Sequence, residues 1–155
     1  MADMTADQMK DFYRSTLDPG IYDKRIRPNQ GGDPVHVEVS MYLLAVHDYD
    51  PKEEEIKLMS YFRQKWNDSR LAHTGTGDMV GRSELMNQIW TPDTFFPSSR
   101  DGYVAATTVP NLFVKISPAG EVMVSMRTTQ QVACNAMYRF YMDPMTCSLE
   151  IESCE

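Results

Sequence analysis

Two cysteines, Cys134 and Cys147, enclose twelve residues with the sequence NAMYRFYMDPMT. The alternating segment EVMVSMRTTQQVAC leads into the first cysteine, and the shorter alternating run SLEIES follows the second. Alternation of this kind is typical of β-strands, so both cysteines are predicted to lie at strand ends. A disulfide between them would favour the folded state by about 3 kcal/mol, through the entropy of closing a loop of this length. Two buried free thiols are the alternative, because cysteine also packs well as a small apolar side chain.

Three other segments show the same alternation of apolar and polar residues: residues 35–44, 56–66 and 111–117. The third is joined to residues 121–133 by Pro118-Ala119-Gly120, which is a hairpin signal. Along residues 56–66 the alternation predicts an inward set (Ile56, Leu58, Ser60, Phe62, Gln64, Trp66) and an outward set (Lys57, Met59, Tyr61, Arg63, Lys65). Many short strands with turn signals between them predict an all-β chain folded as an immunoglobulin-like β-sandwich.

Helical spacing and turn residues predict the remaining segments. Residues 5–17 place apolar side chains at the i, i+3, i+4 spacing, and Asp18-Pro19-Gly20 ends this short N-terminal helix. Prolines interrupt residues 89–97, so that stretch is predicted as an edge strand or an ordered loop. Residues 48–55 are interpreted as an acidic, solvated turn, and Asp101-Gly102 as another turn.

Composition excludes several classes of function. A chain of 155 residues is long enough for one domain with a real core. A net charge of -7 argues against nucleic acid or an anionic membrane surface as a partner. No apolar run approaches the roughly 18 residues of a membrane span, and the first ten residues lack the apolar stretch of a secretory signal. The chain as written is therefore expected neither to enter nor to cross a membrane.

The sequence offers little for catalysis. His36, His47 and His73 have neither each other nor a cysteine at metal-ligand spacing. No serine has the context of a catalytic nucleophile, and no glycine-rich phosphate loop is present. We therefore expect no metal, no cofactor and no enzymatic activity.

The segment CNAMYRFYMDPMTC resembles the signature loop of the Cys-loop, or pentameric, ligand-gated ion channels. The segments YDKRIRPNQGGDPVHVEVSM, YFRQKWNDSRL, IWTPDTFFPSSRDGYV, TVPNLFVKI and MVSMRTT also match, and together they are similar to the anion-conducting branch gated by GABA, glycine, glutamate or histamine. The loop differs from the family's in two ways: it is one residue shorter, and Tyr141 stands where the family has proline.

The resemblance implies that Cys134 pairs with Cys147 and that Cys154 is left free. Residues 1–20 would form an N-terminal helical segment, and residues 21–155 an incomplete neurotransmitter-gated channel ligand-binding domain. In the family, further strands, the rest of the ligand site and four membrane helices follow this point. The chain is therefore expected to be C-terminally truncated.

An outward strand face is the candidate binding site. If the two strands are neighbours, Arg63 and Ser125 could bind a small carboxylate and Tyr61 could offer its ring to an ammonium group, although a solvated face with cross-strand pairs is the alternative. The resemblance assigns Tyr61, Arg63, Met123 and Ser125 to the complementary face of the transmitter site, and Phe95 to the principal face. An arginine and a hydroxyl at these places look like the GABA-gated members.

The leading interpretation is the extracellular ligand-binding region of a GABA-like chloride channel subunit. Such a subunit would recognise a small amino-acid transmitter, join other subunits in a pentamer and lie at the cell membrane, anchored by parts absent from this chain. The alternative is a truncated, non-conducting soluble module that binds or interferes with the assembly of receptor subunits. Trp66 and Asp93 match family positions but are interpreted as structural, a core tryptophan and a turn-capping aspartate. Asn67-Asp68-Ser69 is a glycosylation sequon, which predicts a glycan on Asn67.

Overall fold

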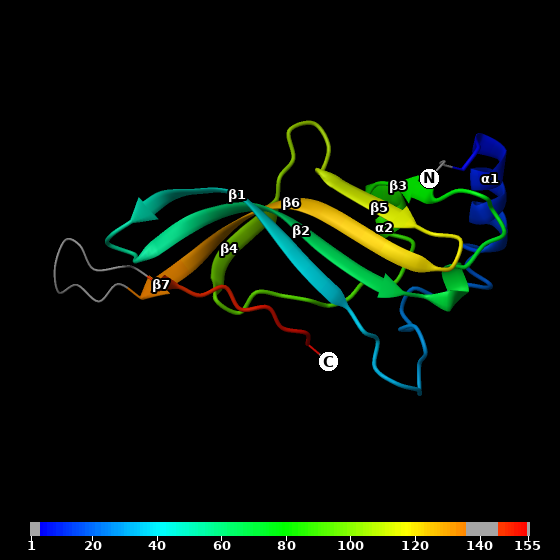
Figure 1. Ribbon diagram of the computed structural model, residues 1–155, viewed down its shortest axis with the longest axis horizontal. Coiled ribbons are helices and arrows are strands. Elements are labelled where there is room, and N and C mark those ends of the chain that lie inside the picture. Colours follow the sequence, from blue (N-terminus) through cyan, green and yellow to red (C-terminus); the bar gives the residue numbers. More distant parts are fainter. Residues whose placement is uncertain (1–3, 136–145, 155) are drawn as a thin grey trace. The chain divides into compact units, whose positions relative to one another are not determined.

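The computed structural model describes residues 4–135 and 146–154, apart from the side chain of Asn135 (Figure 1). The elements are α1 (Ala6–Ser15), β1 (Glu38–Asp50), β2 (Glu55–Asn67), the 3-10 helix η1 (Ser69–Leu71), β3 (Met79–Gly81), α2 (Ser83–Met86), β4 (Ser99–Val104), β5 (Leu112–Ile116), β6 (Glu121–Asn135) and β7 (Thr146–Cys147). The predicted all-β class, an immunoglobulin-like β-sandwich with a short N-terminal helix, is confirmed.

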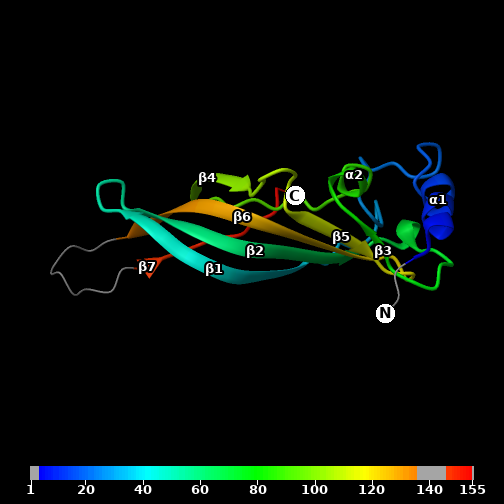
Figure 2. The same cartoon turned by 90° about the horizontal axis from the view of Figure 1, so that it is seen from above.

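Strand β6 is the centre of the sheet formed by the described residues. The strand order is β1-β2-β6-β5-β3, and β4 and β7 also pair with β6. Strand β5 pairs antiparallel with the first part of β6, from Leu112↔Met126 to Ile116↔Val122. Strand β4 pairs with the next part, from Val104↔Thr128 to Ser99↔Val132. The turned view in Figure 2 shows β2 and β6 running side by side.

The chain divides into two compact units. Unit 1 comprises Met1–Ser40, Arg63–Thr91 and Leu112–Met126. Its core joins α1, the connecting segments and the inward faces of β2, β5 and β6, with the following buried apolar residues: Met4, Phe12, Leu17, Tyr22, Trp66, Leu71, Met79, Leu85, Ile89, Val114, Ile116, Val122 and Val124. The predicted hairpin at Pro118-Ala119-Gly120 is confirmed, because Gly120 N–H donates to Ser117 O at 2.9 Å.

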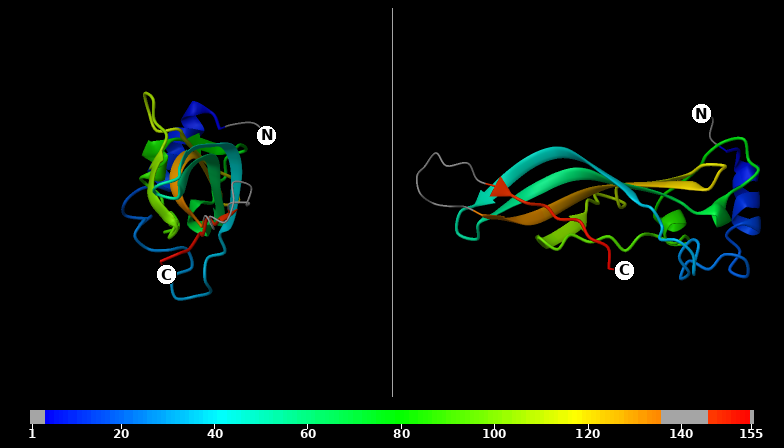
Figure 3. Two further views of the ribbon diagram at one scale, coloured as in Figure 1. Left: turned by 90° about the vertical axis from the view of Figure 1, so that its left-hand side faces the viewer. Right: turned by 60° about the horizontal axis from the view of Figure 1, so that its bottom comes forward.

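Unit 2 comprises Met41–Phe62, Pro92–Asn111 and Arg127–Glu155. Its core has Ile56, Val132 and Cys134 at the centre, with partly buried Leu58, Cys147 and Leu149 packed against them. The ring of Phe62 meets that of Phe96 edge-on, with centroids 5.0 Å apart. Figure 3 shows the short β7 beside the end of β6, where the two cysteines are paired.

Helix α1 forms where the spacing of apolar residues predicts it. Thr5 caps its first turn: Gln8 N–H donates to the Thr5 hydroxyl, and Thr5 N–H donates to the Gln8 side chain, a reciprocal capping box. Phe12 is the buried residue of the helix, and its ring meets His73 edge-on at 5.3 Å. The helix is thereby joined to the core of unit 1.

The predicted alternation in β2 is confirmed from Ser60 onward, since Ser60, Phe62, Gln64 and Trp66 are buried and the residues between them are exposed. It does not hold at Lys57, Leu58 and Met59, which are all half-buried. Other predictions were wrong in detail. Asp101-Gly102 is not a turn but lies inside β4. This strand pairs with β6, and the pairing shifts register between Ser99 and Asp101. Asp48 and Asp50 lie in β1 and not in the turn that follows it. Leu43 and Leu44 are both exposed, so the half-buried pattern of β1 does not extend to them.

Candidate functional site

The polar side of the sheet in unit 1 carries the predicted ligand-binding residues of β6. Directly opposed residues of an antiparallel pair share a face, and Phe113 lies opposite Ser125 while Lys115 lies opposite Met123. The alternate positions, Val114 and Val124 among them, are fully buried on the other side. We call the side of the sheet opposite these buried valines the outer face of unit 1. Its residues are Arg63, Lys65, Glu121, Met123, Ser125, Phe113 and Lys115.

Contacts between β2 and β6 place Arg63 on this face. Lys65 forms an ion pair with Glu121, and Asp68 N–H donates to Gly120 O at 2.9 Å. Strands β2 and β6 therefore run antiparallel. Arg63 is two residues before Lys65, and Met123 is two residues after Glu121. In an antiparallel pair these two positions are neighbours on the same face.

The cations of the outer face differ in how they are engaged. Lys65 is paired with Glu121, and Lys115 Nζ lies 2.7 Å from Oδ2 of the buried Asp78. Arg63 is exposed, and within residues 4–135 and 146–154 its side chain makes no hydrogen bond or ion pair. The hydroxyl of the half-buried Ser125 is likewise unengaged by any described residue. The outer face therefore presents a guanidinium and a hydroxyl that can donate to an added anion.

The two aromatic residues among the predicted ligand-binding residues, Tyr61 and Phe95, belong to unit 2. Tyr61 is 37% exposed on β2, on the outward side of the alternation. Phe95 is 39% exposed, and its backbone exchanges two hydrogen bonds with Glu152, at 2.9 and 3.1 Å. Both aromatic rings are thus accessible, and their part in ligand binding stays a prediction.

The predicted structural roles of Trp66 and Asp93 have different outcomes. Trp66 is 2% exposed and meets the ring of Trp90 edge-on at 6.0 Å, as expected of a core tryptophan. Asp93 accepts hydrogen bonds from the Ser153 hydroxyl at 2.6 Å and from Cys154 N–H at 3.0 Å. Asp93 therefore binds a segment about sixty residues later in the chain, a contact that the predicted role as a local turn cap did not include.

Sequence reasoning missed a buried polar network in unit 1. Arg70 donates from Nε to Asp68 Oδ1 at 2.8 Å and from Nη2 to Asp68 Oδ2 at 2.7 Å. The Tyr22 hydroxyl donates to Asp68 Oδ2 at 2.9 Å and accepts from Trp90 N–H at 2.9 Å. The guanidinium carbon of Arg70 lies 4.5 Å from the centre of the Tyr22 ring. The only local signal was the Asp-x-Arg spacing directly after β2.

This network shifts two acid–base equilibria. Burial, helped by the charge and hydrogen bond of Asp68, raises the pKa of Tyr22 although Trp90 N–H and Arg70 act in the opposite direction. The hydrogen bonds and charge of Asp68 raise the pKa of Arg70 against the effect of its own desolvation. A fully buried carboxylate is tolerated here because each of its oxygens is paired.

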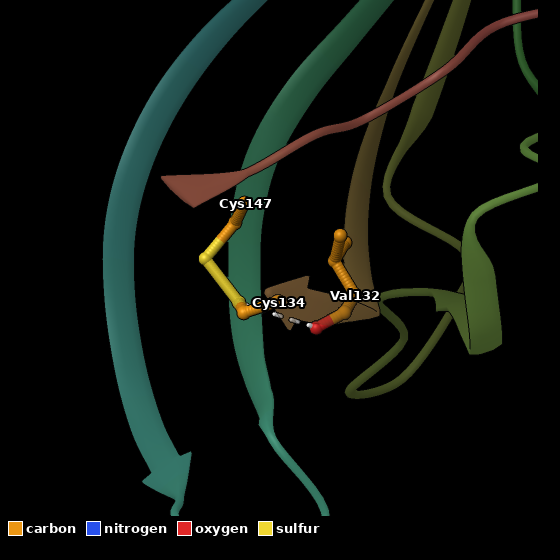
Figure 4. The surroundings of a disulfide bond; sticks show 3 residues. All are labelled: Val132, Cys134 and Cys147. Atoms are coloured by element: carbon orange, nitrogen blue, oxygen red, sulfur yellow. Dashed lines mark hydrogen bonds between the residues drawn. A yellow bond between two sulfur atoms is a disulfide. The ribbon is translucent and has the colours of Figure 1, made fainter. Parts of the chain in front are cut away.

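The predicted disulfide is present, and it joins Cys134 to Cys147 (Figure 4). Cys134 is buried, and with Val132, two residues before it, it belongs to the core of unit 2. Cys154 is free and exposed, as the resemblance implied. The remainder of the loop, including Tyr141, lies outside the described residues.

The described residues contain no cluster of three or more His, Cys, Asp or Glu side chains that could hold a metal ion. Among them there is also no helix long and apolar enough to cross a membrane.

Comparison with known proteins identifies the family. Residues 9–155 match the neurotransmitter-gated ion-channel ligand binding domain. The chain is 34% identical over 134 residues to the mouse gamma-aminobutyric acid receptor subunit theta, covering 85% of this chain and 21% of that protein. It is 33% identical to the chicken beta-4 subunit and 31% identical to the rat pi subunit, with 85% of this chain covered in both cases and 28% and 30% of those proteins. The chain therefore spans less than a third of the length of these relatives. It belongs to the family of neurotransmitter-gated ion-channel ligand-binding domains, which are parts of ligand-gated channels and not enzymes.

Proposed function

We propose that this chain is the transmitter-recognising part of a GABA-like chloride channel subunit, and that the outer face of unit 1 binds the carboxylate of the transmitter. The observation that carries the proposal is the unengaged guanidinium of Arg63 beside a lysine that is already paired. The likeness to gamma-aminobutyric acid receptor subunits supports the choice of transmitter class.

The chemistry of the outer face suits an amino-acid transmitter. A guanidinium can grip a carboxylate through two parallel N–H bonds, which gives both affinity and orientation. The Ser125 hydroxyl would add a neutral donor, and Met123 would give the site an apolar wall. Lys65 is less available, because a new anion would have to displace Glu121.

The remaining predicted residues complete the proposal. Within unit 2, Tyr61 is proposed to offer the face of its exposed ring to an ammonium group. Phe95 is proposed to act on the principal face, toward a different neighbour. One chain then supplies only part of each site, and a transmitter would bind where subunits meet in a pentamer on the extracellular side of the cell membrane.

Electrophysiology on a full-length subunit that carries this segment tests the proposal. GABA, glycine, glutamate and histamine would be applied separately to oocytes that express it, and the reversal potential measured at two chloride concentrations. We expect a GABA-evoked current whose reversal potential follows chloride. A channel that reaches the surface but opens to none of the four transmitters, or reverses independently of chloride, would contradict the proposal.

A further inference from the structure

We propose that Asn67 carries an N-linked glycan, and that this glycan stands at the end of the outer face of unit 1. Asn67-Asp68-Ser69 is the single Asn-X-Ser/Thr sequence among the 155 residues, and its middle residue is not proline. A sequon alone occurs often by chance, so the proposal depends on how the fold presents these three residues.

The acceptor and the hydroxyl of the sequon both face solvent. Asn67 is the last residue of β2 and is exposed, while Ser69 is exposed at the start of η1. Neither side chain makes a hydrogen bond to any part of the chain that the structure describes. A sugar on the Asn67 amide nitrogen would therefore break no hydrogen bond or ion pair with the described residues.

The residue between them has the opposite environment. Asp68 is fully buried and is held by Arg70 and Tyr22. Because successive side chains of a strand point to opposite sides, the burial of Trp66 and Asp68 fixes Asn67 outward. The sequon is thus anchored at its centre while its acceptor is held in water, which is the arrangement that a bulky, solvated modification needs.

The position of Asn67 has a consequence for what can cover the outer face. Asn67 follows Lys65 and Arg63 on the same side of β2, four residues and about 13 Å beyond Arg63. A protein surface that packs over Arg63 must then end before Asn67, because a branched polar glycan cannot be buried in an interface. This consequence rests on the proposed function, in which a neighbouring subunit meets this face; the modification itself does not.

Occupancy can be measured on this chain alone. It would be made in secretory cells behind a cleavable leader and with a C-terminal tag that has its own sequon, which reports entry into the endoplasmic reticulum. Digestion with peptide N-glycosidase should remove two glycans from the wild type and from Ser69→Thr, but one from Asn67→Gln and Ser69→Ala. The matched control is Asn111→Gln, which changes an exposed asparagine outside any sequon and should retain both. If the wild type carries the tag glycan only, or if Asn67→Gln retains both, the proposal is wrong.

The placement of the glycan needs the assembled receptor. Native full-length receptor at the cell surface would be treated with the glycosidase before and after denaturation, and the Asn67 peptide followed by mass spectrometry. We expect the glycan to be removed from the native receptor. If it is released only after denaturation, a partner covers Asn67 and the proposed end of the interface is wrong. Neither result tests the proposed binding of the transmitter, which is measured separately.

Discussion

Tyr22 donates its phenolic hydrogen to a carboxylate oxygen of the buried Asp68 at 2.9 Å, across 46 residues of chain. The same hydroxyl accepts Trp90 N–H at 2.9 Å. One oxygen atom thus joins the loop after α1, the end of β2 and the segment after α2 in unit 1. The free energy of unfolding should depend on this atom.

Tyr22→Phe should lower the free energy of unfolding by about 1–3 kcal/mol, because it leaves Trp90 N–H without an acceptor and removes one donor from Asp68. Urea unfolding followed by tryptophan fluorescence measures this. The matched control is Tyr42→Phe, which removes an exposed hydroxyl and should stay within about 0.5 kcal/mol of the wild type. Equal midpoints for the two variants would show that the Tyr22 hydroxyl contributes nothing.

The network also predicts a dependence of stability on alkaline pH. Burial raises the pKa of Tyr22 above its ordinary value of 10.0, so above that pH the unfolded chain loses a proton that the folded chain keeps. This contribution to stability is present below the unfolded pKa and is lost as the pH rises toward the folded pKa. The difference in stability between wild type and Tyr22→Phe should therefore shrink above pH 10. A difference that is constant or grows between pH 9 and pH 11 would contradict this assignment.

Gly120 should tolerate substitution less than Gly31, although both have positive φ, 85° and 84°. Gly31→Ala meets no atom within 4 Å and should cost only the backbone strain, about 1–2 kcal/mol. In Gly120→Ala the new Cβ would lie 2.5 Å from Asp68 O, which should add about 1–3 kcal/mol. Chemical denaturation of both variants compares the two costs, and similar values would mean that the Gly120 turn does not pack on Asp68 as described.

The cysteines should differ sharply in reactivity. Before reduction, alkylation and peptide mapping should modify Cys154 alone, because Cys134 and Cys147 are joined. Replacing both paired cysteines with serine should lower the free energy of unfolding by about 3 kcal/mol, since it reopens a loop with a separation of 13 residues. Cys154→Ser, at an exposed position, is the control and should be nearly neutral. Three alkylated cysteines in the unreduced chain would contradict the pairing.

The parts of the fold that the sequence predicts are those whose pattern is local. The apolar spacing of α1 and the alternation of β2 from Ser60 to Trp66 can be read from consecutive positions, so both elements are confirmed. Strand β4 was missed because Ser-Arg-Asp-Gly has turn residues and few apolar side chains. Its strand geometry comes from pairing with β6, which lies far along the chain.

The sequence predicts which residues of β2 face outward but not what they contact. Alternation places Arg63 and Lys65 on the same side of β2 and cannot distinguish them. The distinction arises from the register of β2 on β6, which brings Glu121 to Lys65 and not to Arg63. The Tyr22 and Asp68 contact was missed for the same reason, because it joins segments that no local pattern connects.

The most direct test of the account is whether Arg63 binds the transmitter. In a full-length subunit, Arg63→Ala should reduce apparent affinity by about 1.5–3 kcal/mol, roughly a 10- to 150-fold rise in the half-maximal concentration, as for a lost hydrogen bond to a charged group. Ser125→Ala, which removes a neutral donor, should cost about 1 kcal/mol. Lys65→Ala is the matched control on the same strand face, and it should cost less than about 1 kcal/mol because it removes only a half-exposed ion pair.

The measurement is a set of dose-response curves for a carboxylate-bearing transmitter, recorded from oocytes at equal surface expression. Arg63→Ala should shift the curve roughly 10- to 150-fold, and Lys65→Ala by less than about fivefold. Equal shifts for Arg63→Ala and Lys65→Ala would mean that the outer face of unit 1 is ordinary solvated surface and that the proposed site is wrong.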